Sequence, residues 1–133
     1  MSQVQDYFNE LNLKLMESEI IEGFQIKKER ITITDGYIRI QGKLINGDLI
    51  EFSEYCRFYN EMVVEEYTFH WQDSKGNLIR RWDNAKHHPE LKNFPHHVHV
   101  DEETKVLPSE CNPQQTLLLL EKLEQLYGEK EGV

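Results

Sequence analysis

The chain has 133 residues, of which 38% are hydrophobic, 11% aromatic and 29% charged, and its formal net charge is −9. This length is typical of one domain, and the aromatic content is too high for a disordered chain. Charged residues interrupt every apolar run before the ~18 residues of a membrane span, and the N-terminal residues do not resemble a secretion signal. Two cysteines make no disulfide framework. We therefore expect a single cytoplasmic domain, residues 1–133, rather than a membrane protein, a secreted cystine scaffold or a fibrous protein.

The first predicted element is an amphipathic helix that begins after Ser2. Ser2 and Gln5 have the spacing of a capping box. Large apolar side chains then recur at intervals of three and four residues, which places them on one helical stripe. This stripe consists of Val4, Tyr7, Phe8, Leu11 and Leu15.

From about residue 20 the apolar period changes from 3.6 to 2, which predicts β-strands. Asp35-Gly36 and Asn46-Gly47 predict hairpin turns, the second of type I′. Further strands are predicted at about residues 49–59, 62–72 and 78–82, with a short edge strand at 97–100. The short connections between them favour an antiparallel meander.

The last predicted element is a leucine-rich helix. Asn112-Pro113 supplies an N-cap and a first helical proline, Gln115 stands at the third helical position, and Gly128 predicts the end. The apolar arc of residues 116–127 is wider than one stripe, so this helix could pack on the sheet and also form a homodimer contact. The expected fold class is α+β: a five- or six-stranded antiparallel meander with an N-terminal and a C-terminal helix packed on one face.

Positive charge and histidines are concentrated in residues 75–100. This window carries a net charge of +3, against −12 for the rest of the chain, and it holds five of the six histidines. Its centre, residues 83–95, contains two prolines and no hydrophobic period, which predicts a long loop. Loops of this length in small domains are more often functional than decorative.

Three chemistries could use this window. A zinc site could form from His97, His99 and Asp101 with His87 or His88, although their spacing matches no established zinc motif. Alternatively, the histidines could hold the loop on the sheet by hydrogen bonds. The third chemistry is RNA cleavage without a metal or cofactor. It needs a base for the 2′-hydroxyl, an acid for the leaving oxygen and a cation on the phosphate, which imidazole and guanidinium groups supply.

For RNA cleavage, Arg81 is the predicted phosphate clamp and Asp83 the residue that orients a histidine. Glu54 lies on a largely apolar strand face, either at its rim or desolvated with a raised pKa, and could be a second carboxylate in the same pocket. The candidate catalytic residues are His70, Arg81, Asp83, His96, His97, His99 and Glu54. Trp82 and Phe94 could stack on bases, and the candidate RNA-binding residues are Arg80, Trp82, Lys86, His87, His88, Lys92 and Phe94.

These motifs resemble the TumE family of toxin–antitoxin proteins. The resemblance rests on Glu54 and on three segments: 67–72 (YTFHWQ), 81–90 (RWDNAKHHPE) and 94–99 (FPHHVH). It implies the toxin of a two-gene module, neutralised by an antitoxin with a DNA-binding domain, and RNA cleavage as the activity. Two features depart from this expectation. Lys86 stands where the family commonly has proline, and a net charge of −9 is unusual for a ribonuclease. The alternative is a non-catalytic or metal-binding module whose histidine-rich loop recognises a partner.

Overall fold

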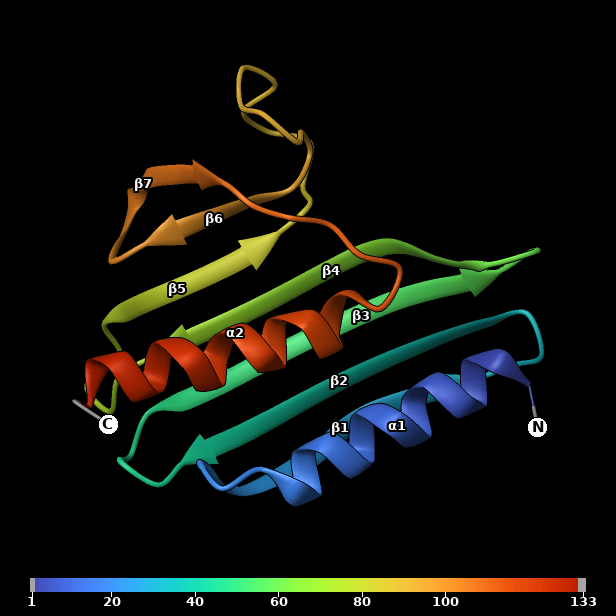
Figure 1. Cartoon of the computed structure of the whole chain (residues 1–133), viewed down its shortest axis with the longest axis horizontal. Helices are drawn as coiled ribbons and strands as arrows, with labels where there is room; N and C mark the ends of the chain where they lie inside the picture. Colours follow the sequence, from blue (N-terminus) through green and yellow to red (C-terminus); the bar gives the residue numbers. More distant parts are fainter. Residues whose placement is uncertain (1, 132–133) are drawn as a thin grey trace.

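The computed structural model describes residues 2–131, which form two helices and one sheet of seven strands. The helices are α1 (Gln3–Glu17) and α2 (Gln115–Lys130). The strands are β1 (Ile21–Ile31), β2 (Asp35–Leu44), β3 (Leu49–Phe58), β4 (Met62–Gln72), β5 (Leu78–Asp83), β6 (His97–Val100) and β7 (Glu102–Pro108). All strands pair antiparallel in sequence order, and both helices cover the same face of the sheet (Figure 1). The predicted α+β meander is confirmed, with one strand beyond the predicted maximum.

The N-terminal helix forms as its sequence predicts. The hydroxyl oxygen of Ser2 accepts a hydrogen bond from the Gln5 amide at 3.1 Å, which caps the helix. All five residues of the apolar stripe are buried against the sheet, where α1 contacts β1, β2 and β3. The helix is therefore held by both a local cap and the core.

The first hairpin turn lies at residues 32–34, so the predicted turn at Asp35-Gly36 is wrong. Both residues instead belong to β2, and the Thr32 hydroxyl closes the turn by donating to the Asp35 carboxylate at 2.7 Å. Gly36 serves a different purpose, because a Cβ there would lie 2.6 Å from the Val4 side chain. Its missing side chain lets β2 approach α1. A turn is confirmed at Asn46-Gly47, but the predicted type I′ is wrong: Gly47 has φ +97°, whereas Asn46 does not have a positive φ. The Gly47 amide closes the turn by donating to the Leu44 carbonyl at 2.9 Å.

Two features of the C-terminal part differ from the sequence prediction. Strand β7 was not predicted, because most of its side chains are exposed and show no apolar alternation; Asp101, at φ +64°, joins it to β6. Regular helix begins at Gln115 and continues past Gly128. The bonds of the predicted cap are nevertheless present: Asn112 Oδ1 accepts from the Gln114 amide, and Gln115 Oε1 accepts from the Asn112 amide, both at 2.8 Å.

The wide apolar arc of α2 is accounted for by packing within the chain. Its leucines are all buried or half-buried, and the helix contacts β4 beside α1. The predicted packing on the sheet is thus confirmed, whereas the homodimer stays a prediction.

Glu54 is buried on the helix side of the sheet, so the expectation that it shares a pocket with the histidines is wrong. Its Oε1 accepts hydrogen bonds from the Tyr7 hydroxyl and the Thr116 hydroxyl, each at 2.8 Å, and from the Thr116 amide at 3.2 Å. Its Oε2 has no hydrogen-bond partner among the described residues. Burial raises the pKa of Glu54 to about 7, despite the opposing effect of these hydrogen bonds. The carboxyl group therefore links α1, β3 and α2.

Replacing Glu54 should flatten the pH dependence of stability. Because the pKa of Glu54 in the folded chain is about 7, above its ordinary value of 4.5, the fold favours the protonated carboxyl. Its contribution is therefore complete below about pH 4.5 and is lost as the pH rises through 7. One pKa unit is worth ~1.4 kcal/mol, so the loss at pH 8 is roughly 3 kcal/mol. In urea unfolding at pH 5 and pH 8, the difference in unfolding free energy should be smaller for Glu54→Gln than for the wild type.

Glu10→Gln is the matched control, because Glu10 is exposed on α1. It should keep the pH dependence of the wild type. If Glu54→Gln shows the same change between pH 5 and pH 8 as the wild type, the carboxyl group is not held as the structure indicates.

Candidate functional site

The face of the sheet opposite the helices carries the polar candidates, because alternate side chains of a strand point to opposite faces. On β5, Trp82 points into the core, while Arg81 and Asp83 point away from the helices. The pairing of β5 with β6 places His97 opposite Asp83 and His99 opposite Arg81. Strand register thus brings together residues that are separated by the loop of residues 84–96.

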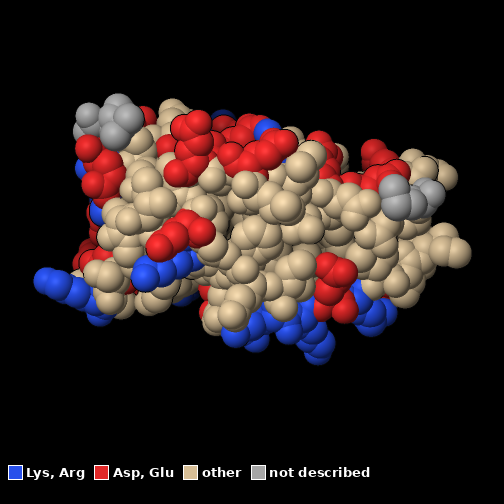
Figure 2. All heavy atoms as spheres, turned by 90° about the horizontal axis from the view of Figure 1, so that it is seen from below, with Lys and Arg blue, Asp and Glu red and all other residues tan. Residues whose placement is uncertain are grey.

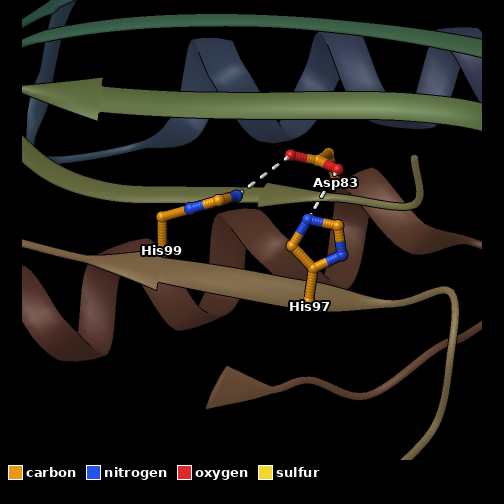
Figure 3. Close-up of side chains that lie close together, drawn as sticks. All are labelled: Asp83, His97 and His99. Atoms are coloured by element: carbon orange, nitrogen blue, oxygen red, sulfur yellow. Dashed lines mark ion pairs between the residues drawn. The ribbon is translucent and has the colours of Figure 1, made fainter. Parts of the chain in front are cut away.

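Asp83, His97 and His99 form a compact buried cluster (Figure 3). The His97 Nε2 lies 2.9 Å from Asp83 Oδ1, and the His99 Nε2 lies 3.9 Å from Asp83 Oδ2. Asp83 Oδ1 also accepts a hydrogen bond from the Ala85 amide at 3.0 Å, which fixes the start of the loop. One carboxylate therefore faces both imidazoles and holds the chain that leaves β5.

Main-chain carbonyls orient both imidazole rings. The His97 Nδ1 lies 2.9 Å from the Pro95 oxygen, and the His99 Nδ1 lies 2.9 Å from the Glu103 oxygen. Since a carbonyl can only accept, each Nδ1 carries the hydrogen, and each Nε2 is directed to Asp83. The 2.9 Å contact between His97 Nε2 and Asp83 Oδ1 therefore pairs the buried imidazole with the buried carboxylate.

A third imidazole, that of His88, joins the cluster from the loop. Its ring centre lies 5.3 Å from that of His97 and 6.2 Å from that of His99. The backbone of His88 has φ +58°, a left-handed conformation that is uncommon for a non-glycine residue. His88 is half-buried and so more accessible than the other two. The sequence identified it only as an RNA-binding candidate; its place beside His97 depends on the path of the loop.

Arg81 borders the cluster and is held by two carboxylates. Its Nη1 lies 2.7 Å from Glu103 Oε1, and its Nε lies 3.4 Å from Asp83 Oδ2. Glu103 is a site residue that the sequence did not indicate, because it lies on the unpredicted strand β7. The guanidinium therefore has a defined position next to the histidines.

The cluster lies beside an open cavity of about 960 Å³ on the helix-free face. The loop contributes Lys86, His87 and His88 to its walls, and β2 and β3 contribute Tyr37, Tyr55 and Arg57. Three of the predicted RNA-binding residues thus border the cavity. Its lining combines imidazoles, cations and aromatic rings with the acidic Glu65 and Glu66.

Two other predicted histidines lie outside the cluster. His70 is on the helix-free face opposite Arg81, but its Nε2 contacts Gln72 Oε1 at 3.1 Å. His96 stacks on Tyr67, and its Nδ1 lies 2.9 Å from the Tyr67 hydroxyl. Burial lowers the pKa of His96. The position of His96 next to His97 in the sequence therefore does not place it in the cluster. His96 precedes β6 and does not follow the alternation of side chains along that strand.

Four predicted RNA-binding residues do not border the cavity. Trp82 is in the core, packed edge-on against Phe69, so the expectation that it stacks on bases is wrong. Arg80 is two residues from Trp82 on β5, so it starts from the same face of the sheet. Its Nη1 lies 3.5 Å from Asp101 Oδ1. The remaining two are exposed loop residues, Lys92 and Phe94.

The sequence model of one protein family, described as toxin TumE, matches residues 11–128 of the chain. This range includes the whole sheet, the histidine cluster, most of α2 and the C-terminal part of α1 from residue 11. No curated protein and no solved structure matched the chain. Among the described residues, no helix has the length and apolar character needed to cross a membrane.

Trp82 and Phe94 form a matched pair for testing the placement of the two aromatic candidates. Trp82 is 3% exposed and Phe94 is 42% exposed. Trp82→Ala should lower the unfolding free energy by ~3–5 kcal/mol, because it leaves a cavity in the core. Phe94→Ala should change it by no more than ~0.5 kcal/mol. Urea denaturation measures both, and a Trp82→Ala variant as stable as the wild type would contradict the assignment of Trp82 to the core.

Proposed function

Because the chain belongs to the toxin TumE family, which implies an antitoxin partner, we propose that this toxin cleaves RNA in the cytoplasm without a metal. We propose in addition that the antitoxin carries a DNA-binding domain. The observation that carries the proposed activity is the group of three imidazoles and one guanidinium around Asp83, beside an open cavity. Histidine and arginine supply the proton transfers and the phosphate contact that RNA transesterification needs.

The proposed reaction is attack of a ribose 2′-oxygen on the adjacent phosphorus. A base takes the 2′-hydroxyl proton, the bond from phosphorus to the 5′-oxygen breaks, and an acid protonates that oxygen, which leaves a 2′,3′-cyclic phosphate. His99 and His88 are the proposed acid–base pair, since both line the cavity and their side chains, 8% and 35% exposed, are more accessible than that of His97. Arg81 is proposed to bind the phosphate oxygens, which accept hydrogen bonds from its guanidinium.

His97 and Asp83 are proposed as positioning residues. The side chain of His97 is 2% exposed, so it is too buried to meet a substrate directly. Its 2.9 Å contact with Asp83 is proposed to fix the carboxylate that also faces His99 and Arg81. In this arrangement the buried pair orients the two groups that contact RNA, and it neutralises charge that develops on them.

Replacing the proposed acid–base residues should abolish toxicity without unfolding the protein. Each protonic role typically contributes ~10²–10⁴-fold, so His88→Ala and His99→Asn should lower RNA cleavage at least a hundredfold, and Arg81→Ala should do the same. His96→Ala is the matched control, because its ring contacts Tyr67 outside the cluster. The measurements are growth arrest on expression without the antitoxin and cleavage of purified RNA, with circular dichroism to verify folding. Variants at His88, His99 and Arg81 that fold and remain toxic would overturn the site assignment. Toxicity without loss of RNA would favour a partner-binding module instead.

A metal-dependent reaction is the second candidate, because the structure places three potential ligands together. One ligand atom from each of Asp83, His97 and His99 lies within 4.8 Å of the other two. Both Nδ1 atoms donate to main-chain carbonyls, an arrangement that also orients metal-binding histidines. Two histidines and one carboxylate suit zinc as a catalytic ligand set.

Chelation distinguishes the two candidates. If the proposed reaction is right, protein stripped with a chelator and transferred to metal-free buffer should cleave RNA at the rate of the untreated protein. Elemental analysis of the stripped sample verifies that no metal remains. Activity that is lost on stripping and restored by one equivalent of zinc would replace the metal-free reaction by the metal-dependent one.

A further inference from the structure

The helix-free face of the sheet holds a second open cavity, of about 700 Å³, that continues the first. Tyr37, Ser53 and Thr68 line both cavities, so the two meet at the middle of the sheet. The second cavity extends over β2, β3 and β4 to Arg39 and His70. Together the two cavities form a continuous groove from the histidine cluster across β5, β4, β3 and β2.

Strand register makes this groove run across the strands. Arg39 pairs with Ser53, Ser53 with Thr68, Thr68 with Asp83, and Asp83 with His97. Directly paired residues in neighbouring strands share a face and are ~4.8 Å apart, so Arg39 lies ~14 Å from Asp83 along this row. A linear ligand in the groove would therefore pass over three strands before it reaches the cluster.

The groove offers aromatic and cationic side chains in adjacent rows. Tyr37 pairs directly with Tyr55, and both are half-buried on the floor of the first cavity. Arg57 lies beside this pair, and Arg39 lies in the next row. Lys28, from β1, adds charge with its ammonium 5.9 Å from the centre of the Tyr37 ring.

Charge is unevenly distributed between the two sides of the molecule, whose net charge is −9. Figure 2 shows Asp and Glu side chains gathered on the side of the helices and most of the visible Lys and Arg side chains on the opposite side. On the helix-free face, the carboxylate of Glu51 is paired with Arg39. The residues that line the two cavities include four cations (Arg39, Arg57, Arg81 and Lys86) and four carboxylates (Glu51, Glu65, Glu66 and Asp83), so the groove is close to neutral on a protein whose net charge is −9.

We propose that single-stranded RNA lies in this groove across β2 to β5, with bases on Tyr37 and Tyr55 and phosphates at Arg39 and Arg57. Aromatic rings with cationic side chains beside them bind unpaired bases by stacking, whereas a duplex keeps its bases stacked inside the helix. The assignment of RNA as the ligand rests on the proposed function. The groove would hold the RNA on one side of the cleavage position, from the cluster to Arg39.

The test compares binding and cleavage for a single-stranded oligonucleotide, a dinucleotide and a duplex of the same sequence. Fluorescence anisotropy measures binding, and initial rates give KM and kcat. Tyr37→Leu should weaken oligonucleotide binding about tenfold and raise KM with little change in kcat, because one stacked base contributes ~1–3 kcal/mol. Tyr37→Phe keeps the ring and should bind like the wild type. Dinucleotide cleavage should be unchanged in both variants, because the dinucleotide occupies only the cluster.

Arginine is tested by the double variant Arg39→Gln with Glu51→Gln, which removes an ion pair without changing the net charge. It should also weaken oligonucleotide binding severalfold and flatten its salt dependence. The matched control is Lys14→Gln, on α1 and outside both cavities. Urea unfolding verifies that each variant is folded.

The outcomes separate this inference from the proposed function. If the wild type binds RNA but does not cleave it, and Tyr37→Leu loses this binding, the groove is upheld and the nuclease is overturned. If the wild type cleaves RNA, and the folded Tyr37 and Arg39 variants bind RNA as tightly as the wild type, the groove is overturned and the nuclease is upheld. Equal binding of the duplex, or no binding of single-stranded RNA at all, would also overturn the groove.

Discussion

The antiparallel pairing of β5 with β6 is the constraint on which the site depends. In this register Asp83 lies opposite His97, and Arg81 lies opposite His99. The same alternation sends Trp82 into the core. A slip by one residue would exchange the two faces of the strand and move the histidines under the helices. Because burial of the core stabilises only one register, the hydrophobic effect also holds the polar cluster together.

Main-chain atoms from two separate segments complete the cluster. The Pro95 carbonyl orients His97 from the end of the loop, and the Glu103 carbonyl orients His99 from β7. Asn84 anchors the start of the loop, since its side chain bonds the Tyr67 amide and the Glu65 carbonyl of β4. The loop is thus fixed at both ends by hydrogen bonds, so the position of His88 is set by a structured connection.

The sheet separates two kinds of buried polar chemistry. On the helix side, Glu54 is enclosed by Tyr7 and Thr116, and its raised pKa reflects burial. On the other side, Asp83 is enclosed by two imidazoles beside an open cavity. Glu54 therefore belongs to the packing of the helices, and Asp83 to the face that meets solvent and ligand. The uneven distribution of charge follows the same division (Figure 2).

Local patterns in the sequence determined much of the fold. The cap and stripe of α1, the Asn46-Gly47 turn and the alternation of β4 depend on neighbours within a few residues, so they could be predicted. The same alternation predicts that His97 and His99 share a face, and the family motif predicts the toxin role.

Only the tertiary structure decided which faces meet. Glu54 and Asp83 lie on strands 29 positions apart in the chain, and their separation by the sheet depends on how β3, β4 and β5 are paired. Trp82 and Asp83 are neighbours in sequence, yet one is in the core and the other in the site. Strand β7, the position of His88 and the groove across the sheet likewise arise from pairing between distant segments. Periodicity reports which residues share a face, but contact between strands determines which face is covered by helices.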